Sequence, residues 1–231
     1  MASSFLTASW RNLVLMNWRV DQSLLAPHLP RGVELDQWDG DYWASMVGFQ
    51  FQDMSVKGIP AFGYRDFPEI NLRFYVKRKI NGETRRGVVF IREITPHLMV
   101  GWVARTLYNE PYVTLPMRQS VDDKKALYQI KLDGRWQGLG LKPVGSLRKQ
   151  QEPELFITEH YWGYNRQRNG EAMEYKVEHP TWRVCSVKLE CFDLDIKKLY
   201  GPHWAEALKE NPDSMVFADG SSVTVHSGVL I

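Results

Sequence analysis

The chain has 231 residues, a near balance of 29 basic and 27 acidic side chains, and a formal net charge of +2. This length allows a sizeable core, and we expect one domain over residues 1–231. The balanced charge excludes the clustered basic excess of most nucleic-acid-binding proteins, so we expect no nucleic-acid partner. Nine tryptophans and an aromatic content of 13% suit layered β packing or an aromatic-walled pocket.

Targeting and redox signals are absent from the sequence. The first residues lack a basic stretch followed by an apolar run, and no apolar stretch is long enough to span a membrane. Cys185 and Cys191 would lie about 20 Å apart on one strand face, so they cannot form a disulfide with each other. No metal-ligand spacing is present. We therefore expect a cytoplasmic protein with reduced thiols, no metal, no cofactor and no membrane association.

The first third of the chain is predicted to be mostly β. Asp21 is a good N-cap for a short helix that ends near Pro30. Glycines and a proline predict a loop over 53–67. The expected elements before that loop are strands at 8–20, 33–35 and 42–52 and a helix at 22–28.

The segment 69–94 has the strongest strand pattern, and its polar face is unusual. With a period of two, Ile70, Leu72, Phe74 and Val76 share one face, while Glu69, Asn71, Arg73 and Tyr75 share the other. A carboxylate, an amide, a guanidinium and a phenol in a row are groups that bind or transform a small polar molecule. A solvated face with one salt bridge is the alternative interpretation.

A turn at Asn81 and Gly82 would determine which residues pair across this hairpin. A tight turn places Arg73 opposite Phe90 and Asn71 opposite Arg92, which brings Arg92 onto the polar face. A bulge near 84–86 would shift the register and move side chains to the other face.

Most of the remaining expected elements are strands, and only two regions are expected to be helical. We expect a mobile loop or an inert surface crossover at 142–153. Many strands without regular βα alternation predict a mainly β (α+β) fold, an antiparallel barrel or sandwich with a few packed helices. The other expected elements are helices at 97–109 and within 195–211, and strands at 112–117, 126–132, 136–141, 156–165, 172–178, 184–192 and 222–231.

Four further residues are candidates for the site. Arg105 sits late on an apolar helix, where it either reaches water or enters the interior to pair with a carboxylate such as Glu69. His160 is either an acid–base group or a structural histidine, and the pattern leaves open which face of its strand looks inward. His179 and Trp182 form either a strand end or a pocket rim.

Several of these residues belong to a set of segments that resembles the uncharacterised YqjF-like family, in the acetoacetate decarboxylase-like superfamily. The resemblance implies a cone-like β-barrel with an internal cavity and identifies Glu69 with a strand glutamate of the decarboxylases and Arg105 with their arginine. The matching segments are 35–43, 67–76, 87–90, 104–105, 110–112, 159–161 and 179–182.

The chain departs from the decarboxylase pattern at one decisive place. In those enzymes a lysine forms a Schiff base with a β-keto acid, and a second lysine lowers its pKa. The corresponding Pro-Lys-Lys segment falls here on Pro111, Tyr112 and Val113, so both lysines are missing. His160 also stands where the YqjF-like pattern usually has Arg. Decarboxylation through a Schiff base is therefore not expected.

The sequence leaves two functions open. The first is a lyase- or isomerase-type enzyme acting on a small oxo acid, with Glu69, Arg105 and Tyr112 as catalytic groups. The second is a non-catalytic binding or sensing protein for a small anionic or aromatic metabolite. A homo-oligomer is compatible with the sequence, which specifies none. The expected ligand-binding residues are Asn71, Arg73, Tyr75, Arg92, His160, His179 and Trp182.

Overall fold

The computed structural model describes residues 4–98, 101 and 109–231 of the chain. The predicted helix at 97–109 falls mostly on residues outside these ranges. The helical elements are α1 (Gln22–Leu25), η1 (Ala26–His28), α3 (Glu154–Thr158), α4 (Ile196–Tyr200) and α5 (Pro202–Ala207). The strands are β1 (Ser4–Val20), β2 (Glu34–Leu35), β3 (Tyr42–Val56), β4 (Ile59–Pro60), β5 (Phe67–Ile80), β6 (Glu83–Thr95), β7 (Tyr112–Thr114), β8 (Met117–Asp122), β9 (Lys125–Leu132), β10 (Arg135–Arg148), β11 (Trp162–Arg166), β12 (Ala172–Glu178), β13 (Val184–Phe192), β14 (Ser214–His226) and β15 (Val229–Leu230).

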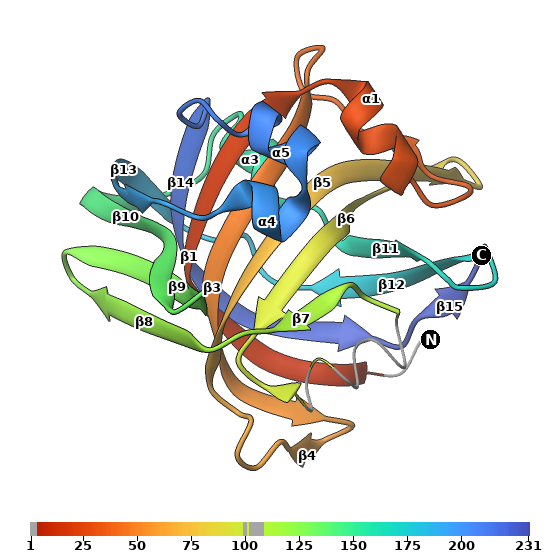
Figure 1. The fold of residues 1–231 in the computed structure, drawn as a ribbon. Helices are drawn as coiled ribbons and strands as arrows, with labels where there is room; N and C mark the ends of the chain where they lie inside the picture. Colours follow the sequence, from red (N-terminus) through yellow and green to blue (C-terminus); the bar gives the residue numbers. More distant parts are fainter. Residues whose placement is uncertain (1–3, 99–100, 102–108) are drawn as a thin grey trace.

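The strands form one strongly curved sheet that closes on itself (Figure 1). The order β12-β11-β6-β5-β3-β1-β14 returns to β12 because Val177 pairs with Val225. Most pairings are antiparallel, but β11 runs parallel to β6 and β7 runs parallel to β6. From β14 the sheet continues through β13, β10, β9 and β8. The mainly β, barrel-like class predicted from the sequence is confirmed.

Two apolar cores lie on opposite sides of the barrel wall. The inner core gathers Leu15, Val47 and Phe49 with Phe156 and Ile157 of α3. The outer core packs the apolar face of β5, as predicted, against Leu199, Trp204 and their neighbours, with Tyr128 of β9 in the same cluster. Figure 1 shows α4 and α5 in front of β3 and β5, with α1 beside them. Burial on both sides explains why β5 has so few exposed side chains.

Several element boundaries that were predicted from capping and turn residues are present in the structure. The Asp21 carboxylate accepts a hydrogen bond from the Ser23 N–H at 2.7 Å, which confirms the N-cap of α1. Asn81 and Gly82 have φ values of 50° and 82°, and Ile80 pairs with Glu83, which confirms the tight hairpin turn. Cys185 and Cys191 are both free, as expected.

Three predicted segments are wrong in part. The loop predicted at 53–67 instead contains the end of β3 and the short strand β4, because Ser55 pairs with Pro60 and Val56 with Ile59. In the other two segments, contacts with distant parts of the chain decide the outcome. The loop predicted at 142–153 is instead the second half of β10 up to Arg148, because it pairs with β13 as far as Val184. The strand predicted at 156–165 begins as the helical turn α3. There the Thr158 hydroxyl donates to the Glu154 carbonyl at 2.9 Å, and burial of Phe156 and Ile157 closes one part of the barrel.

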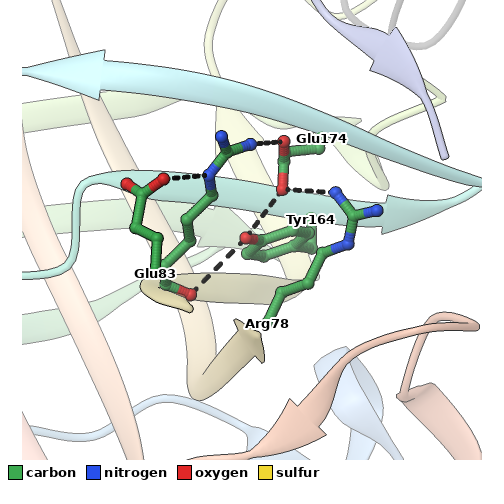
Figure 2. A network of polar contacts seen from close by, with 5 residues as sticks. Arg78, Glu83, Tyr164 and Glu174 are labelled. Atoms are coloured by element: carbon green, nitrogen blue, oxygen red, sulfur yellow. Dashed lines mark hydrogen bonds and ion pairs between the residues drawn. The ribbon is translucent and has the colours of Figure 1, made fainter. Parts of the chain in front are cut away.

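The parallel contact between β6 and β11 is short and is reinforced by a buried ionic network (Figure 2). The Glu174 carboxylate, 2% exposed, accepts from Arg78 at 3.1 Å, from Arg85 at 2.6 Å and from the Tyr164 hydroxyl at 3.0 Å. Gly87 permits this approach because an added Cβ would lie 2.5 Å from the Trp162 carbonyl oxygen. The network links β5 and β6 to β11 and β12.

Replacing Glu174 should therefore weaken the barrel more than replacing an exposed partner of the same network. We expect Glu174→Gln to lower the free energy of unfolding by about 2–4 kcal/mol, because two arginines lose their buried counter-charge. The matched control is Glu83→Gln, which alters an exposed contact to Arg85 at 3.3 Å and should cost less than about 1 kcal/mol. Urea unfolding measures both, and equal losses would contradict this role of Glu174.

Candidate functional site

The closed part of the sheet encloses a cavity of about 320 Å³. Its wall is mostly apolar. The lining residues come from β1, β3, β5, β6, β7, β11, β12, β14 and α3, and from the segments around Tyr64, Glu110, His160 and Trp182. Such a site suits a small molecule that is largely removed from water. The aromatic residues of the wall include Phe5, Trp10, Phe49, Phe51, Phe67, Phe90, Trp162 and Trp182.

Three of the four residues predicted for the polar face of β5 line this cavity. Glu69, Asn71 and Arg73 line the cavity. Tyr75 lies beyond the lining, where its hydroxyl is 2.5 Å from Ser45 Oγ and its ring packs 5.0 Å from Phe156. The structure therefore places Tyr75 in the inner core, and its ring supports the wall behind Arg73.

A β-bulge in β6 overturns the predicted place of Arg92. Arg73 pairs with Phe90 as expected, but Leu72 pairs with Arg92 and Asn71 pairs with Glu93. One extra residue in β6 exchanges the two faces beyond the bulge. Arg92 therefore turns to the outside, where it donates to the Leu199 carbonyl and lies over the Tyr200 ring. Glu93 takes the cavity-facing position instead.

Glu69 is held by two neutral donors. The Tyr112 hydroxyl donates to Glu69 Oε2 at 2.8 Å, and Asn71 Nδ2 donates to Oε1 at 3.0 Å. Tyr112 reaches this place because β7 runs parallel to β6, opposite Glu93. Burial raises the pKa of Glu69 to about 7, although both hydrogen bonds oppose the shift. Burial also raises the pKa of Tyr112, so the phenol keeps its proton.

Glu93 and Glu110 complete a group of three buried carboxyl groups with Glu69. Glu110 Oε1 accepts from the Tyr175 hydroxyl at 2.8 Å and from Asn165 Nδ2 at 3.0 Å. Burial raises the pKa of Glu110 to about 7. Burial, followed by the charges of Glu110 and Glu69, raises the pKa of Glu93 well above its ordinary value. We call Glu69, Glu93 and Glu110 the glutamate cluster.

Sequence reasoning missed two members of this cluster. Glu93 would be found only if a bulge were placed near Ile91, and an alternation pattern does not reveal a bulge at that position. Glu110 precedes Pro111 in a segment without a regular period. Glu110 could have been found from the family resemblance, because it belongs with Tyr112 to the matching segment 110–112.

Arg73 and the two histidines lie along another part of the wall. Arg73 Nη2 donates to the Ile157 carbonyl at 3.1 Å, and its buried Nε has no partner among the described residues. His160 Nε2 is 3.5 Å from Asp36, and His179 stacks on Trp182 with 4.2 Å between ring centroids. Burial lowers the pKa of both histidines, which favours their neutral forms. Trp182 is oriented by a 2.8 Å hydrogen bond from Nε1 to Ser221.

The remaining predictions about the site concern Arg105, lysine and metal. Arg105 lies outside the described residues. No lysine is among the described residues that line the cavity, and Tyr112 occupies the position that the resemblance assigns to a lysine segment. Within the described ranges, no group of three or more His, Cys, Asp or Glu is suited to hold a metal ion. In these same ranges no helix has the length and apolar character needed to cross a lipid bilayer.

Burial of the glutamate cluster should make stability depend on pH. Below about pH 4.5 the carboxyl groups are protonated in both the folded and the unfolded chain. As the pH rises towards 7, the unfolded chain releases protons that folded Glu69 and Glu110 retain, so the folded state loses stability. Relative to wild type, Glu69→Gln and Glu110→Gln should gain up to about 3 kcal/mol between pH 4.5 and 7.5.

Urea unfolding at several pH values measures this difference. Glu178→Gln is the control, because the exposed Glu178 carboxylate has a pKa lowered by Lys176 and His226. Removing that carboxylate should give no relative gain as the pH rises. A flat difference between wild type and both cavity variants from pH 4.5 to 7.5 would contradict the burial of charge at the cluster.

Solved structures with a similar fold have very different sequences. Acetoacetate decarboxylase from Legionella pneumophila has a TM-score of 0.69 at 12% identity, covering 99% of this chain and 88% of that chain. The enduracididine biosynthesis enzyme MppR, complexed with pyruvate, has a TM-score of 0.65 at 14% identity, covering 100% and 91%. An acetoacetate decarboxylase-like enzyme from Sphingomonas wittichii RW1 gives 0.65 at 13% identity, covering 99% and 94%. These similarities establish the acetoacetate decarboxylase-like fold.

Sequence comparison places the chain more narrowly. It is 27% identical to the uncharacterized protein YqjF of Bacillus subtilis over 188 residues, which are 79% of this chain and 76% of that protein. The family DUF2071, described as an uncharacterized conserved protein, matches residues 7–222. Because this match covers most of the chain, the chain belongs to the DUF2071 family.

Proposed function

We propose that this protein is an acid–base enzyme of the lyase or isomerase type that acts on a small oxo acid without a Schiff-base lysine. The observation that carries the proposal is the hydrogen-bonded pair of Tyr112 and Glu69 on the wall of an otherwise mostly apolar cavity. A carboxyl group whose pKa is about 7 is well matched to proton transfer at neutral pH.

In the proposed reaction, Glu69 removes a proton from the carbon next to the substrate carbonyl. The electron pair of that C–H bond forms a C=C bond, and the carbonyl π electrons move to the oxygen. Once Glu69 holds the proton, its carboxyl group accepts less strongly, and the Tyr112 hydroxyl can donate to the new oxyanion. Where the substrate has a C=C bond conjugated with the enolate, return of the proton to the far carbon re-forms the carbonyl and gives an isomer. Where it has a leaving group on the β-carbon, the carbonyl re-forms, a C=C bond forms between the α- and β-carbons, and the group departs with the electron pair of its bond, which gives a lyase product.

Arg73 is the proposed anchor for the substrate carboxylate. Its guanidinium lines the cavity and keeps a donor, Nε, without a partner in the described chain. A charge-assisted hydrogen bond to a carboxylate would fill that site. His160, His179 and Trp182 form the neighbouring wall. MppR binds pyruvate in a similar fold, which supports an oxo acid as the substrate class.

A non-catalytic binding protein is the second candidate. The mostly apolar and aromatic wall favours it, because such walls supply affinity without requiring chemistry. In that case Glu69 and Arg73 orient a small anionic or aromatic metabolite, and no proton leaves the ligand.

Exchange of substrate C–H protons with deuterated solvent separates the two candidates. We expect wild type to catalyse exchange next to the carbonyl of at least one member of a panel that includes pyruvate, 2-oxobutanoate and acetoacetate, followed by proton NMR. Glu69→Gln should slow that exchange by about 10²–10⁴-fold, and Tyr112→Phe should slow it less. Glu178→Gln, on the exposed side of β12, should leave the rate unchanged.

Two results would overturn the enzymatic proposal. One is exchange that survives Glu69→Gln at the wild-type rate. The other is saturable binding of panel members without exchange by wild type, which would support the binding protein instead.

A further inference from the structure

Three buried acceptor atoms on one part of the cavity wall have no hydrogen-bond partner in the described chain. They are Oδ1 of Asn71, Oε2 of Glu93 and Oε2 of Glu110. Their residues are only 3%, 4% and 5% exposed, and all three line the cavity. A buried polar atom without a partner costs free energy, so such atoms usually mark a site that something else fills.

The backbone brings these three residues together. Asn71 of β5 stands opposite Glu93 of β6, and the Glu93 N–H donates to the carbonyl of Pro111, next to Glu110. Other hydrogen bonds hold these side chains, and for Glu93 the partner is Tyr112. Asn71 gives its amide N–H to Glu69, and Glu110 receives Tyr175 and Asn165 on Oε1. What remains at this end of the cavity is a set of acceptors.

Further along β5 the cavity wall presents a hydrogen-bond donor instead of acceptors. Arg73 is two residues from Asn71, about 7 Å along the strand, and its buried Nε is a donor without a partner. The cavity therefore offers the oxygen atoms of an amide and two carboxyl groups at one end and a cation at the other. A molecule that satisfies both ends must itself carry donors at one end and an anionic acceptor at the other.

We propose that the ligand of this cavity is zwitterionic, with a carboxylate at Arg73 and a cationic nitrogen group bound by Asn71, Glu93 and Glu110. An ammonium group carries three donors, which matches three open acceptors. Its charge also offsets the repulsion among the carboxyl groups of the cluster. This proposal rests on the proposed function for the carboxylate end and narrows the substrate class to oxo acids that also carry a cationic nitrogen group.

Binding of a cation should change the protonation of the cluster. A positive charge beside Glu93 and Glu110 favours their ionised forms, so binding near pH 7 should release protons. A monocarboxylate that contacts only Arg73 should release none.

Isothermal titration calorimetry with simple probes tests the proposal. The probes are the ω-amino acids from 4-aminobutanoate to 7-aminoheptanoate, each compared with the unsubstituted carboxylate of the same length. At the best length we expect the amino acid to bind at least tenfold more tightly, with proton release that appears as a dependence on the ionisation enthalpy of the buffer. Glu93→Gln should weaken both effects, because one of the two carboxyl groups at the nitrogen site is lost, and Glu178→Gln should retain both.

The outcomes distinguish this inference from the proposed function. Absence of an amino-group preference at every length would overturn the inference, as would a preference that persists unchanged in Glu93→Gln. Exchange catalysed through Glu69 is measured separately, so a preference without exchange would leave the nitrogen site standing and reject the enzyme. Exchange without an amino-group preference would support the enzyme and reject the nitrogen site.

Discussion

Burial of three carboxyl groups inside an apolar barrel is the constraint on which the site depends. Carboxylates are rarely buried without a cationic partner, and the described contacts of Glu69 and Glu110 are with neutral tyrosine and asparagine side chains. Burial raises the pKa of Glu69 and Glu110 to about 7 and raises the pKa of Glu93 well above its ordinary value. The same burial makes these groups costly to stability and useful for proton transfer.

The barrel can hold such a cluster because its wall is stabilised elsewhere. The outer face of β5 packs against α4, α5 and β9, so the strand is anchored by apolar contacts that do not involve the cavity. The parallel pairing of β6 with β11 is short, and the Glu174 network reinforces it. This network lies on the side of the wall away from the glutamate cluster. The Glu174 network and the candidate site thus lie on opposite sides of one layer of strands.

The fold is shared with acetoacetate decarboxylase, but no lysine is among the described residues that line the cavity. The resemblance assigns Tyr112 to a segment that carries lysine in the decarboxylases, and the phenol contacts Glu69, identified with their strand glutamate. The substitution replaces a nucleophilic amine by a neutral donor. An iminium cannot form at a phenol, and the remaining groups suit proton transfer and the binding of charged ligand ends.

Strand periodicity and turn chemistry alone determined the faces of β5, the hairpin at Asn81 and Gly82, the N-cap at Asp21 and the mainly β class. These depend on neighbours within a few residues, so they can be read locally. Tertiary structure decided the bulge that exchanges Arg92 for Glu93, the helical turn α3 and the extension of β10. The extension of β10 depends on pairing with β13, the bulge on how β6 pairs with β5, and α3 on burial of Phe156 and Ile157 in the inner core. The glutamate cluster exists only where β5, β6 and the segment before β7 meet, and no local pattern carries that information.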